Sequence, residues 1–396
     1  MSNESSVGAT AETGSRDKNR FVWLLDRRLL TTALGSVILV AIAGLLQVRY
    51  GAYSMTLGEV WAGIFNPNVI FNLDAWNSFL FGSELPEMSR DSLIIWELRL
   101  PRVLVAIIVG MNLAVSGAIF QAVTRNELAS PFILGVSSGA GLMILLTLVV
   151  FSGITFAFGL PFLPYEIVFR PSSWLPLVAA LGGAAAFLVV YLIAWKNGTS
   201  PVRLVLAGVI VGTVFNSMQT GLFFFADNIG VVQSAIAWTT GSLTGTGWEE
   251  VRLVLPWSFI AIILAVAGSR QCNVLLLGEE TARSLGMSIE KVRFALSGVA
   301  VLAASASIAV AGIVSFIGLI VPHMVRNLVG SDYKKVIVGS LFVGPALMVT
   351  ADVGARLGMG AILGADLQIP VGIVTGLIGG PYFLYLMRKQ NNMGQI

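Results

Sequence analysis

The hydrophobic positions of this chain are gathered in long continuous runs that short polar stretches separate. A helix needs ~20 apolar residues to cross the ~30 Å hydrocarbon core of a bilayer. Ten runs come near that length: Leu29–Leu46, Val103–Val123, Phe132–Phe151, Trp174–Trp195, Leu204–Ala226, Leu253–Gly268, Phe294–Ala311, Ile313–Val325, Val336–Ala351 and Ile369–Met387. Because none of them alternates with a period of two, the pattern predicts transmembrane helices and argues against a membrane β-barrel.

The runs predict an all-α integral membrane protein with ten transmembrane helices. The sixth, eighth and ninth runs are short, and several are bounded by glycine or proline, which is typical of broken or tilted helices around a cavity. Residues 29–389 then form a single polytopic membrane domain. Residues 1–28 are polar and are expected to form a disordered cytoplasmic tail, and 390–396 a short cytoplasmic C-terminal tail.

Basic residues are distributed unequally between the two sides that ten crossings define. With the N-terminus inside, most of the 24 Lys and Arg residues lie on the cytoplasmic side. Cytoplasmic flanks carry this excess in membrane proteins. Both termini are therefore predicted to be cytoplasmic, in a multi-pass protein of the cell membrane.

The longest polar stretch after the tail, 47–96, lies outside the membrane in this topology. Its aromatic residues stand among asparagines and acidic residues, and they include Trp61, Phe65, Phe71, Trp76, Phe79 and Phe81. Two interpretations stay open for them. The aromatic side chains either lie at the membrane interface or belong to a folded cap that touches a partner or substrate.

Composition agrees with a membrane protein. The chain is 56% hydrophobic and 11% charged, with a mean hydropathy of +0.85, whereas soluble domains are about 25% charged. A single cysteine, Cys272, excludes an intramolecular disulfide and a cysteine-cluster metal site. The net charge of +3 is too small and too scattered to indicate a nucleic-acid partner.

The sequence lacks the residues that would power transport within the chain itself. No lysine follows a glycine, so the phosphate-binding P-loop is absent. The centres of the ten runs carry no ionisable residue, which argues against coupling to a proton or sodium gradient. The only histidine, His323, is expected at a helix end, and a haem would need a second ligand of another type. We therefore expect no catalytic, cofactor or metal site.

The longest internal charged loop, 271–293, has the pattern of two short amphipathic helices. Glu279 and the glutamate after it follow Gly278 and suit a helix N-terminus, where acidic side chains interact favourably with the helix dipole. Gly286 can end this helix in the left-handed conformation, and Ser288 can cap a second short helix. The loop is either a compact cytoplasmic knob or a helix pair lying on the membrane surface.

A series of motifs runs in order from Trp96 to Lys389. It consists of RLPR from Arg99, SGAIFQAVTRNELASPFILGVSSGAG from Ser116, RLVLAGVIVG from Arg203, LLLGEETARSLG from Leu275, AGIVSFIGLIVPHMVRNLVGSDYKK from Ala311, Asp352 with Arg356, and IPVGIVTGLIGGPYF from Ile369. The series resembles the FecCD-type permease family, the transmembrane subunits of ATP-driven importers for iron-siderophores, haem and cobalamin.

This resemblance implies a homodimer or heterodimer of permease subunits around a central path. It also implies two cytoplasmic ABC ATPase subunits, which would bind ATP and Mg²⁺, and an external substrate-binding protein. The chain would then be a transport subunit and not an enzyme. A ferric siderophore is the expected cargo because it is the commonest in the family, with haem or cobalamin as the alternative cargo. The alternative mechanism is a secondary transporter driven by an ion gradient.

The resemblance assigns roles to residues as well. The loop residues implied to seat in the ATPase are Leu277, Gly278, Glu279, Ala282, Arg283, Leu285 and Gly286. External Arg99 and Arg356 match arginines that pair with carboxylates of the binding protein. From the residues alone, Arg99 is equally suited to reach the lipid headgroups, and Arg356 to pair with Asp352 one helical turn away.

The cytoplasmic gate that the resemblance implies consists of Asn126, Leu128, Ser200 and Pro201. Two positions depart from the family pattern, because Glu127 replaces the usual proline and Gln368 replaces the usual glutamate. Glu127 is expected to pair with Arg125 or with an arginine of the partner subunit, because an uncompensated carboxylate in a partly dry constriction is costly. The alternative is that Glu127 faces the path and repels anionic chelates.

Overall fold

The computed structural model describes residues 22–51, 53–151, 156–159, 166–169, 174–196, 198–226, 229–363 and 368–393. The helices at the ten apolar runs are α1 (Arg27–Arg49), α6 (Leu100–Thr124), α7 (Val136–Leu145), α8 (Leu175–Ala194), α9 (Pro201–Phe223), α11 (Trp248–Ala267), α14 (Ile289–Ala311), α15 (Ile317–Val329), α16 (Tyr333–Leu363) and α17 (Val371–Met393). The remaining helices are α2 (Leu57–Ile64), α3 (Pro67–Ile70), α4 (Leu73–Phe81), α5 (Arg90–Leu93), α10 (Ile229–Thr240), α12 (Ser269–Leu276) and α13 (Glu279–Ser284).

Every predicted apolar run coincides with a helix, but the helices differ in length. Seven are long and apolar enough to cross a bilayer, whereas α7 with its π-helical extension to Val150, α15, and the apolar part of α17 have 10–17 residues. The chain is therefore a multi-pass helical protein. The number of crossings and the side on which each end lies stay predictions.

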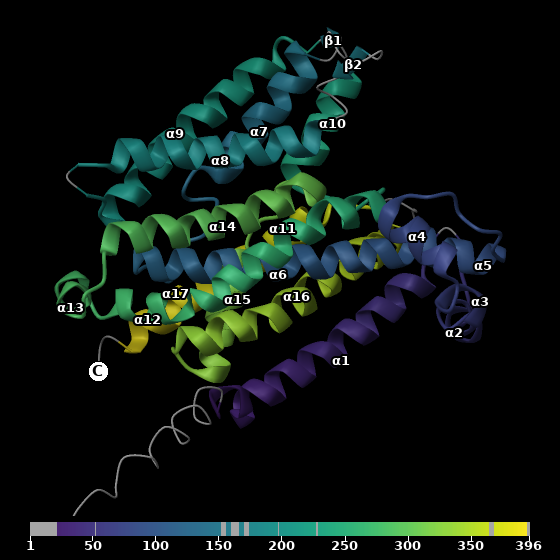
Figure 1. The fold of residues 1–396 in the computed structure, drawn as a ribbon, viewed down its shortest axis with the longest axis horizontal. Helices are drawn as coiled ribbons and strands as arrows, with labels where there is room; N and C mark the ends of the chain where they lie inside the picture. The colour runs from purple at the N-terminus through teal and green to yellow at the C-terminus, as the bar shows by residue number, and fades with distance from the viewer. Residues whose placement is uncertain are drawn as a thin grey trace, which may run out of the picture.

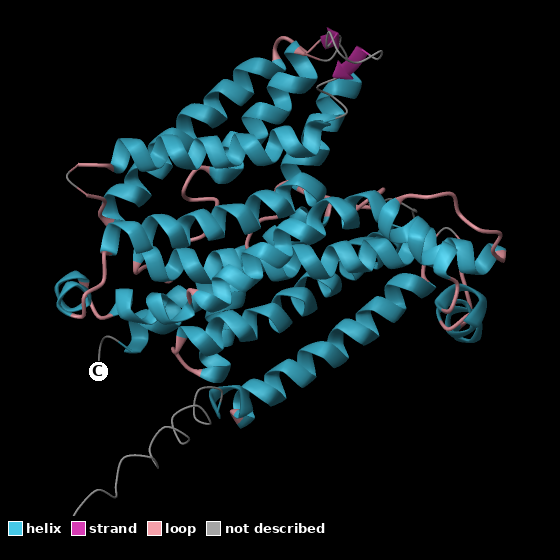
Figure 2. Cartoon of the chain, viewed as in Figure 1, coloured by secondary structure: helices cyan, strands magenta, loops and turns pink. Residues whose placement is uncertain are grey.

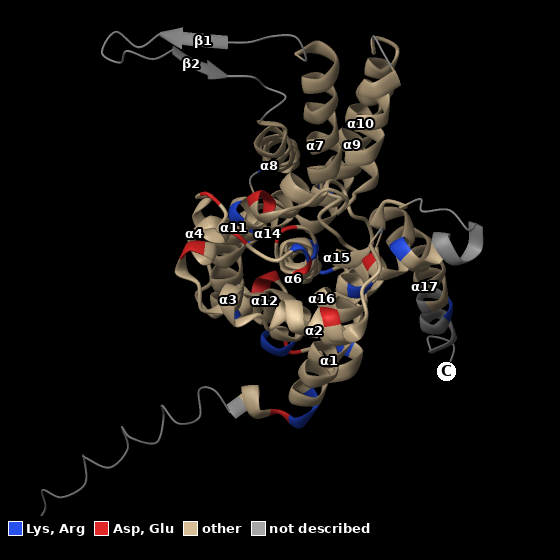
Figure 3. Cartoon of the chain, turned by 90° about the vertical axis from the view of Figure 1, so that its right-hand side faces the viewer, with Lys and Arg blue, Asp and Glu red and all other residues tan. Residues whose placement is uncertain are grey.

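Helix α6 forms the centre of the bundle, where it packs against α11, α14, α15 and α16 (Figures 1 and 3). Two glycine pairs allow this packing. A Cβ atom on Gly117 would lie 1.7 Å from the carbonyl oxygen of Gly318, and one on Gly110 would lie 2.6 Å from that of Gly344. Backbones of membrane helices approach this closely only through such small residues.

Helices α7, α8, α9 and α10 form a second layer along one side of this bundle (Figure 1). Gly139 and Gly182 bring α7 and α8 into contact in the same way, since a Cβ atom on Gly139 would lie 2.4 Å from the carbonyl oxygen of Gly182. The apolar pattern did not predict α10, because its twelve residues are too few to cross a bilayer. The π-helical end of α7, Leu146–Val150, lies beside it.

The all-α prediction needs one correction. Strands β1 (Phe156–Gly159) and β2 (Glu166–Phe169) form an antiparallel hairpin in which Phe156 lies opposite Phe169. Figure 2 shows it as the strand structure of the described chain. It lies between α7 and α8, in a stretch that the apolar pattern left as a loop.

The start of α1, α13 and the end of α17 lie at one end of the bundle, and α2–α5 lie at the other (Figure 1). Residues 1–21 and 394–396 of the two predicted tails fall outside the described residues. Within 22–28 the chain is ordered, which differs from the prediction, because it forms a short 3₁₀ helix at Val22–Leu25 and the first turn of α1. Asp26 caps that turn and pairs with Lys335. Helix α17 likewise runs on to Met393.

The segment 47–96 forms a folded cap. Phe79 stacks between Trp96 and Trp248 at centroid distances of 5.5 and 4.8 Å, and Trp76 meets the edges of Phe79 and Trp96. The indole Nε1 of Trp248 donates to the carbonyl of Trp96 at 2.7 Å. The other predicted aromatics, Trp61, Phe65, Phe71 and Phe81, are exposed. The segment is therefore folded around Phe79, and for the exposed aromatic residues the membrane interface and contact with a partner both stay predictions.

Candidate functional site

The loop 271–293 protrudes at the end of the bundle where α1 begins (Figure 1). Helix α13 starts at Glu279, and the glycines on either side of it have positive φ, +100° at Gly278 and +80° at Gly286. The positive φ of Gly286 was expected from the sequence and is confirmed, whereas that of Gly278 was not predicted. The prediction of a second short helix was wrong. The segment after Ser288 is the first turn of α14, which continues to Ala311, and the Ser288 side chain makes no capping hydrogen bond.

The α13 loop presents apolar side chains to its surroundings. Leu277 is 59% exposed and Leu285 is 64% exposed, while Ala282 between them is fully buried against the bundle. Arg283 lies in the last turn of α13. Exposed leucines on an otherwise anchored loop are typical of a surface that packs against another molecule.

A charged network anchors the start of α13. The Glu279 Oε1 atom accepts hydrogen bonds from Arg125 Nη2 at 3.0 Å and from Arg293 Nη2 at 2.9 Å. Arg293 is fully buried, and its Nη1 donates to the carbonyl of Thr199 at 2.5 Å. Glu290 closes the network, because its Oε2 accepts from the backbone N–H and the hydroxyl of Thr199 at 3.0 and 2.7 Å.

The network fixes the charge of Glu279. Partial burial raises the pKa of its carboxyl, but the hydrogen bond from Arg293 and the charges of Arg293, Arg125 and Arg283 outweigh that effect and hold the pKa below its ordinary value. Glu279 therefore stays ionised as the pH falls through the range around 4.3 where exposed glutamates titrate. Its contribution to stability is present above that range and is lost only below it.

The predicted gate residues lie directly beside this network. Arg125 ends α6 in the left-handed region at φ +49°, which turns the chain into the segment Arg125–Leu128. The side-chain oxygen of Asn126 accepts from the backbone N–H of Leu128 at 2.9 Å, and Leu128 is 36% exposed. In the neighbouring loop, Ser200 caps α9, and Pro201 occupies the first position of that helix.

The expected pairing of Glu127 is found with a different partner. Its carboxylate lies 2.7 Å from Arg326 Nη1 and 3.8 Å from His323 Nδ1, both on α15 of the same chain. Arg125 pairs with Glu279 instead. Arg326 also donates to Gln121 of α6 at 2.7 Å. Glu127 thus joins the gate segment to the bundle.

The two predicted docking arginines lie at the opposite end of the bundle, packed on Gly51. Arg99 is 6% exposed, and its guanidinium donates to the backbone carbonyls of Val48, Arg49 and Tyr53, so it holds the end of α1 in place. Arg356 is half-buried and donates to the carbonyl of Gln47 at 3.2 Å.

A buried ion pair that the sequence did not predict lies next to these arginines. Arg102 binds both carboxylate oxygens of Asp352, at 2.9 and 2.8 Å, and its third nitrogen donates to Gln368 at 3.0 Å. Asp352 is 1% exposed. The alternative that the sequence left open for Arg356, a pair with Asp352, is therefore wrong. Asp352 also lies within α16 and not beyond its end, since the helix continues past the predicted boundary.

Replacing Asp352 by alanine is expected to destabilise the protein by about 3 kcal/mol, because it leaves the charge of Arg102 buried without its partner. The measurement is thermal unfolding in detergent. Glu84→Ala, which removes an exposed acid at the same end of the molecule, is the matched control and should have little effect. Equal unfolding temperatures for the two variants would contradict a stabilising role for the ion pair.

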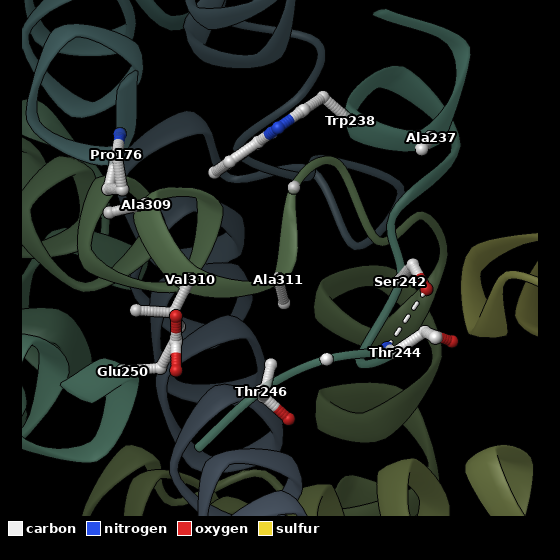
Figure 4. Close-up of a pocket in the computed structure, with 12 residues that line it drawn as sticks. Pro176, Ala237, Trp238, Ser242, Thr244, Thr246, Glu250, Ala309, Val310 and Ala311 are labelled. Atoms are coloured by element: carbon white, nitrogen blue, oxygen red, sulfur yellow. Dashed lines mark hydrogen bonds between the residues drawn. The ribbon is translucent and has the colours of Figure 1, made fainter. Parts of the chain in front are cut away.

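A pocket of about 350 Å³ lies between the α10–α11 connection and the end of α14 (Figure 4). Trp238 and Glu250 are among its lining residues. Two of its polar side chains are bonded to nearby backbone: Glu250 accepts from the N–H of Gly247 at 2.7 Å, and the hydroxyl of Thr246 donates to the carbonyl of Leu243 at 2.9 Å. The pocket contains none of the predicted site residues.

The fold defines a multi-pass helical membrane protein, and one of its ends carries an anchored loop with two exposed leucines. Residues 39–389 match the FecCD transport family. The Fe(3+)-citrate import system permease protein YfmD of Bacillus subtilis is 40% identical over 77% of this chain and 84% of its own length. The iron(3+)-hydroxamate permease FhuG of the same organism is 36% identical over 76% and 86%.

Two further proteins widen the comparison. The cobalamin import system permease protein BtuC of Halobacterium salinarum is 36% identical over 77% of this chain and 76% of its own length. A solved structure described as an inward-facing conformation of a metal-chelate type ABC transporter has a TM-score of 0.72 at 25% identity, over 90% of this chain and 98% of that one. The chain belongs to the FecCD transport family, whose members are non-catalytic permease subunits of ABC importers.

Proposed function

We propose that this chain is the permease subunit of a cell-membrane ABC importer that brings a ferric siderophore into the cytoplasm. Two permease subunits, identical or different, would enclose the path. Two ATPase subunits would bind ATP and Mg²⁺ on the cytoplasmic side, and an external binding protein would deliver the cargo.

The α13 loop carries the argument for an ATPase partner. Leu277 and Leu285 are exposed, and the ion pairs of Glu279 hold the helix between them against the bundle. A loop lying on the membrane surface would favour basic residues near the anionic lipids, yet α13 begins with two glutamates. A fixed apolar surface framed by charges suits a protein cleft.

The cargo is argued from the relatives and not from the site. The citrate and hydroxamate permeases are named for iron(III) chelates, and their identity to this chain equals or exceeds that of the cobalamin permease. A ferric chelate is the cargo we propose, and cobalamin is the alternative.

The gate and docking residues complete the proposal. Leu128 would close the cytoplasmic end of the path, with Asn126 fixing its backbone, and Ser200 with Pro201 would form the facing side. Of the two arginines, Arg356 would meet a carboxylate of the binding protein, because Arg99 is fully engaged by carbonyls at the end of α1.

The test is uptake into proteoliposomes that contain the permease with or without its ATPase subunit. We expect that ⁵⁵Fe-labelled ferric citrate or a ferric hydroxamate, presented with the binding protein, accumulates only with the ATPase and ATP, and that an uncoupler has no effect. Uptake that persists without the ATPase and collapses with the uncoupler would establish a secondary transporter. Uptake of cobalamin but of neither iron chelate would show that cobalamin, and not a ferric chelate, is the cargo.

A further inference from the structure

One carboxylate oxygen joins parts of the chain that the sequence separates widely. Glu279 Oε1 at the start of α13 accepts from Arg125, 154 residues earlier, and from Arg293 on α14. Arg293 in turn holds the α8–α9 loop through the carbonyl of Thr199. The start of α13 is therefore bonded to the gate segment Arg125–Leu128 directly, and to the facing gate loop through Arg293.

The two halves of this network differ in strength. The side chain of Arg293 is 1% exposed and is bonded to Glu279, Glu290 and Thr199, and breaking such a buried set is costly. The side chains of Arg125 and Glu279 are each 32% exposed in their mutual pair. An ion pair open to water contributes little to stability, because solvent screens the two charges. A small displacement of α13 therefore breaks the Arg125 contact before the Arg293 contacts.

The backbone at Arg125 makes this weak contact consequential. Its φ of +49° is one of two positive values among non-glycine residues of the described chain. A non-glycine residue in this region is strained and persists only where its surroundings hold it. The side chain of Arg125 is held by Glu279. Loss of the pair removes a restraint on the residue from which Asn126 and Leu128 continue.

We propose that the Arg125–Glu279 pair is the contact through which α13 controls the gate segment Arg125–Leu128, with Arg125 as a positioning residue. The inference rests on the proposed function and adds which side of the gate α13 acts on. Displacement of α13 frees Arg125 on the Leu128 side of the gate, where Glu127 remains paired with Arg326, while the Thr199 side stays bonded to α14 through Arg293 and Glu290.

The test measures the accessibility of Leu128 in the assembled complex of permease and ATPase. Leu128→Cys supplies the reporter, because the natural Cys272 is fully buried and burial raises the pKa of its thiol to about 12, so it is inert to maleimide. The labelling rate is compared without nucleotide and with ATP plus vanadate. We expect nucleotide to change the rate about tenfold with Arg125 present, a typical size for coupling between sites.

Arg125→Gln is expected to reduce the nucleotide effect to less than about twofold, whereas Arg125→Lys, which keeps the charge, retains most of it. Glu279→Gln should act like Arg125→Gln. Glu280→Gln removes the same charge from the neighbouring, exposed position of α13 and should leave the effect unchanged. A purely structural role of Arg125 would lower the melting temperature without altering the nucleotide effect.

The outcomes separate the inference from the function on which it rests. A full nucleotide effect in Arg125→Gln contradicts the inference alone, as does loss of the effect in Glu280→Gln. A reporter that ignores nucleotide even with Arg125 present contradicts both the gate of the proposed function and the inference. A nucleotide effect that depends on Arg125 and Glu279 but not on Glu280 supports both.

Discussion

The double substitution Leu277→Asp and Leu285→Asp is expected to abolish stable association with the ATPase. Both side chains are more than half exposed in the free chain, and burying a leucine in an interface contributes about 1.5–3 kcal/mol. Losing two such contacts is worth at least about 3 kcal/mol, which weakens binding by ~100-fold or more. The measurement is co-purification of the two subunits, followed by titration of the ATPase onto the purified permease.

Ser284→Asp provides the matched control for this result. Ser284 lies on the same short helix and is exposed, so the variant introduces the same charge without removing an apolar contact. It should bind the ATPase nearly as the unmodified chain does. Equal binding by the double leucine variant and the control would show that the leucines are not the contact surface.

Gly117→Val is expected to have the largest effect on stability. The added Cβ atom would lie 1.7 Å from the carbonyl oxygen of Gly318, a backbone atom that no side-chain rotation can move. Helices α6 and α15 would have to separate, and α6 is packed on α16 and α14 as well. Overpacking of this kind costs about 3 kcal/mol or more, so we expect little folded protein after purification by size exclusion.

Gly298→Ala is the control for the glycine series. This glycine lies within α14, and a Cβ atom on it would meet nothing within 4 Å. The change should leave stability unaltered or raise it by about 0.5–1 kcal/mol, because alanine loses less backbone freedom in a helix. If the Gly117→Val protein unfolded at the same temperature as the Gly298→Ala variant, that result would contradict the close approach of α6 and α15.

The positions of the long helices could be predicted from the sequence because each helix corresponds to one continuous run of apolar residues. The runs beginning at Leu29 and Val103 needed only hydrophobicity and length to be recognised. The same criterion missed α10, whose twelve residues are too few to cross a bilayer. The loop before α14 was also divided wrongly. The charged residues at Glu290–Arg293 have the pattern of a separate surface helix, but they form the first turn of the longer helix α14.

The site was predictable only where its geometry is local. Positive φ at Gly286 follows from a glycine at the end of a short helix. The pairs of Arg125 with Glu279 and Arg102 with Asp352 join residues 154 and 250 positions apart, and no periodicity relates such positions. The one available signal was an arginine at the edge of an apolar run, which must find an acceptor when the helix is buried.

The helical stretch that contains α6 is longer than the membrane is thick. From Arg90 to Thr124, α5, a π-helical segment (Ile94–Arg99) and α6 follow one another without a break for 35 residues, roughly 50 Å at 1.5 Å per residue, whereas a bilayer with its headgroups measures about 40–45 Å. One end carries Trp96 and Arg99 in the cap, and the other ends beside Glu279. One continuous helical stretch thus reaches both ends of the bundle at which the proposed partners would bind. Equilibrium linkage requires any coupling between the two ends to be mutual. If bound nucleotide changes the affinity of the permease for the external binding protein by some factor, the binding protein must change the affinity for nucleotide by the same factor.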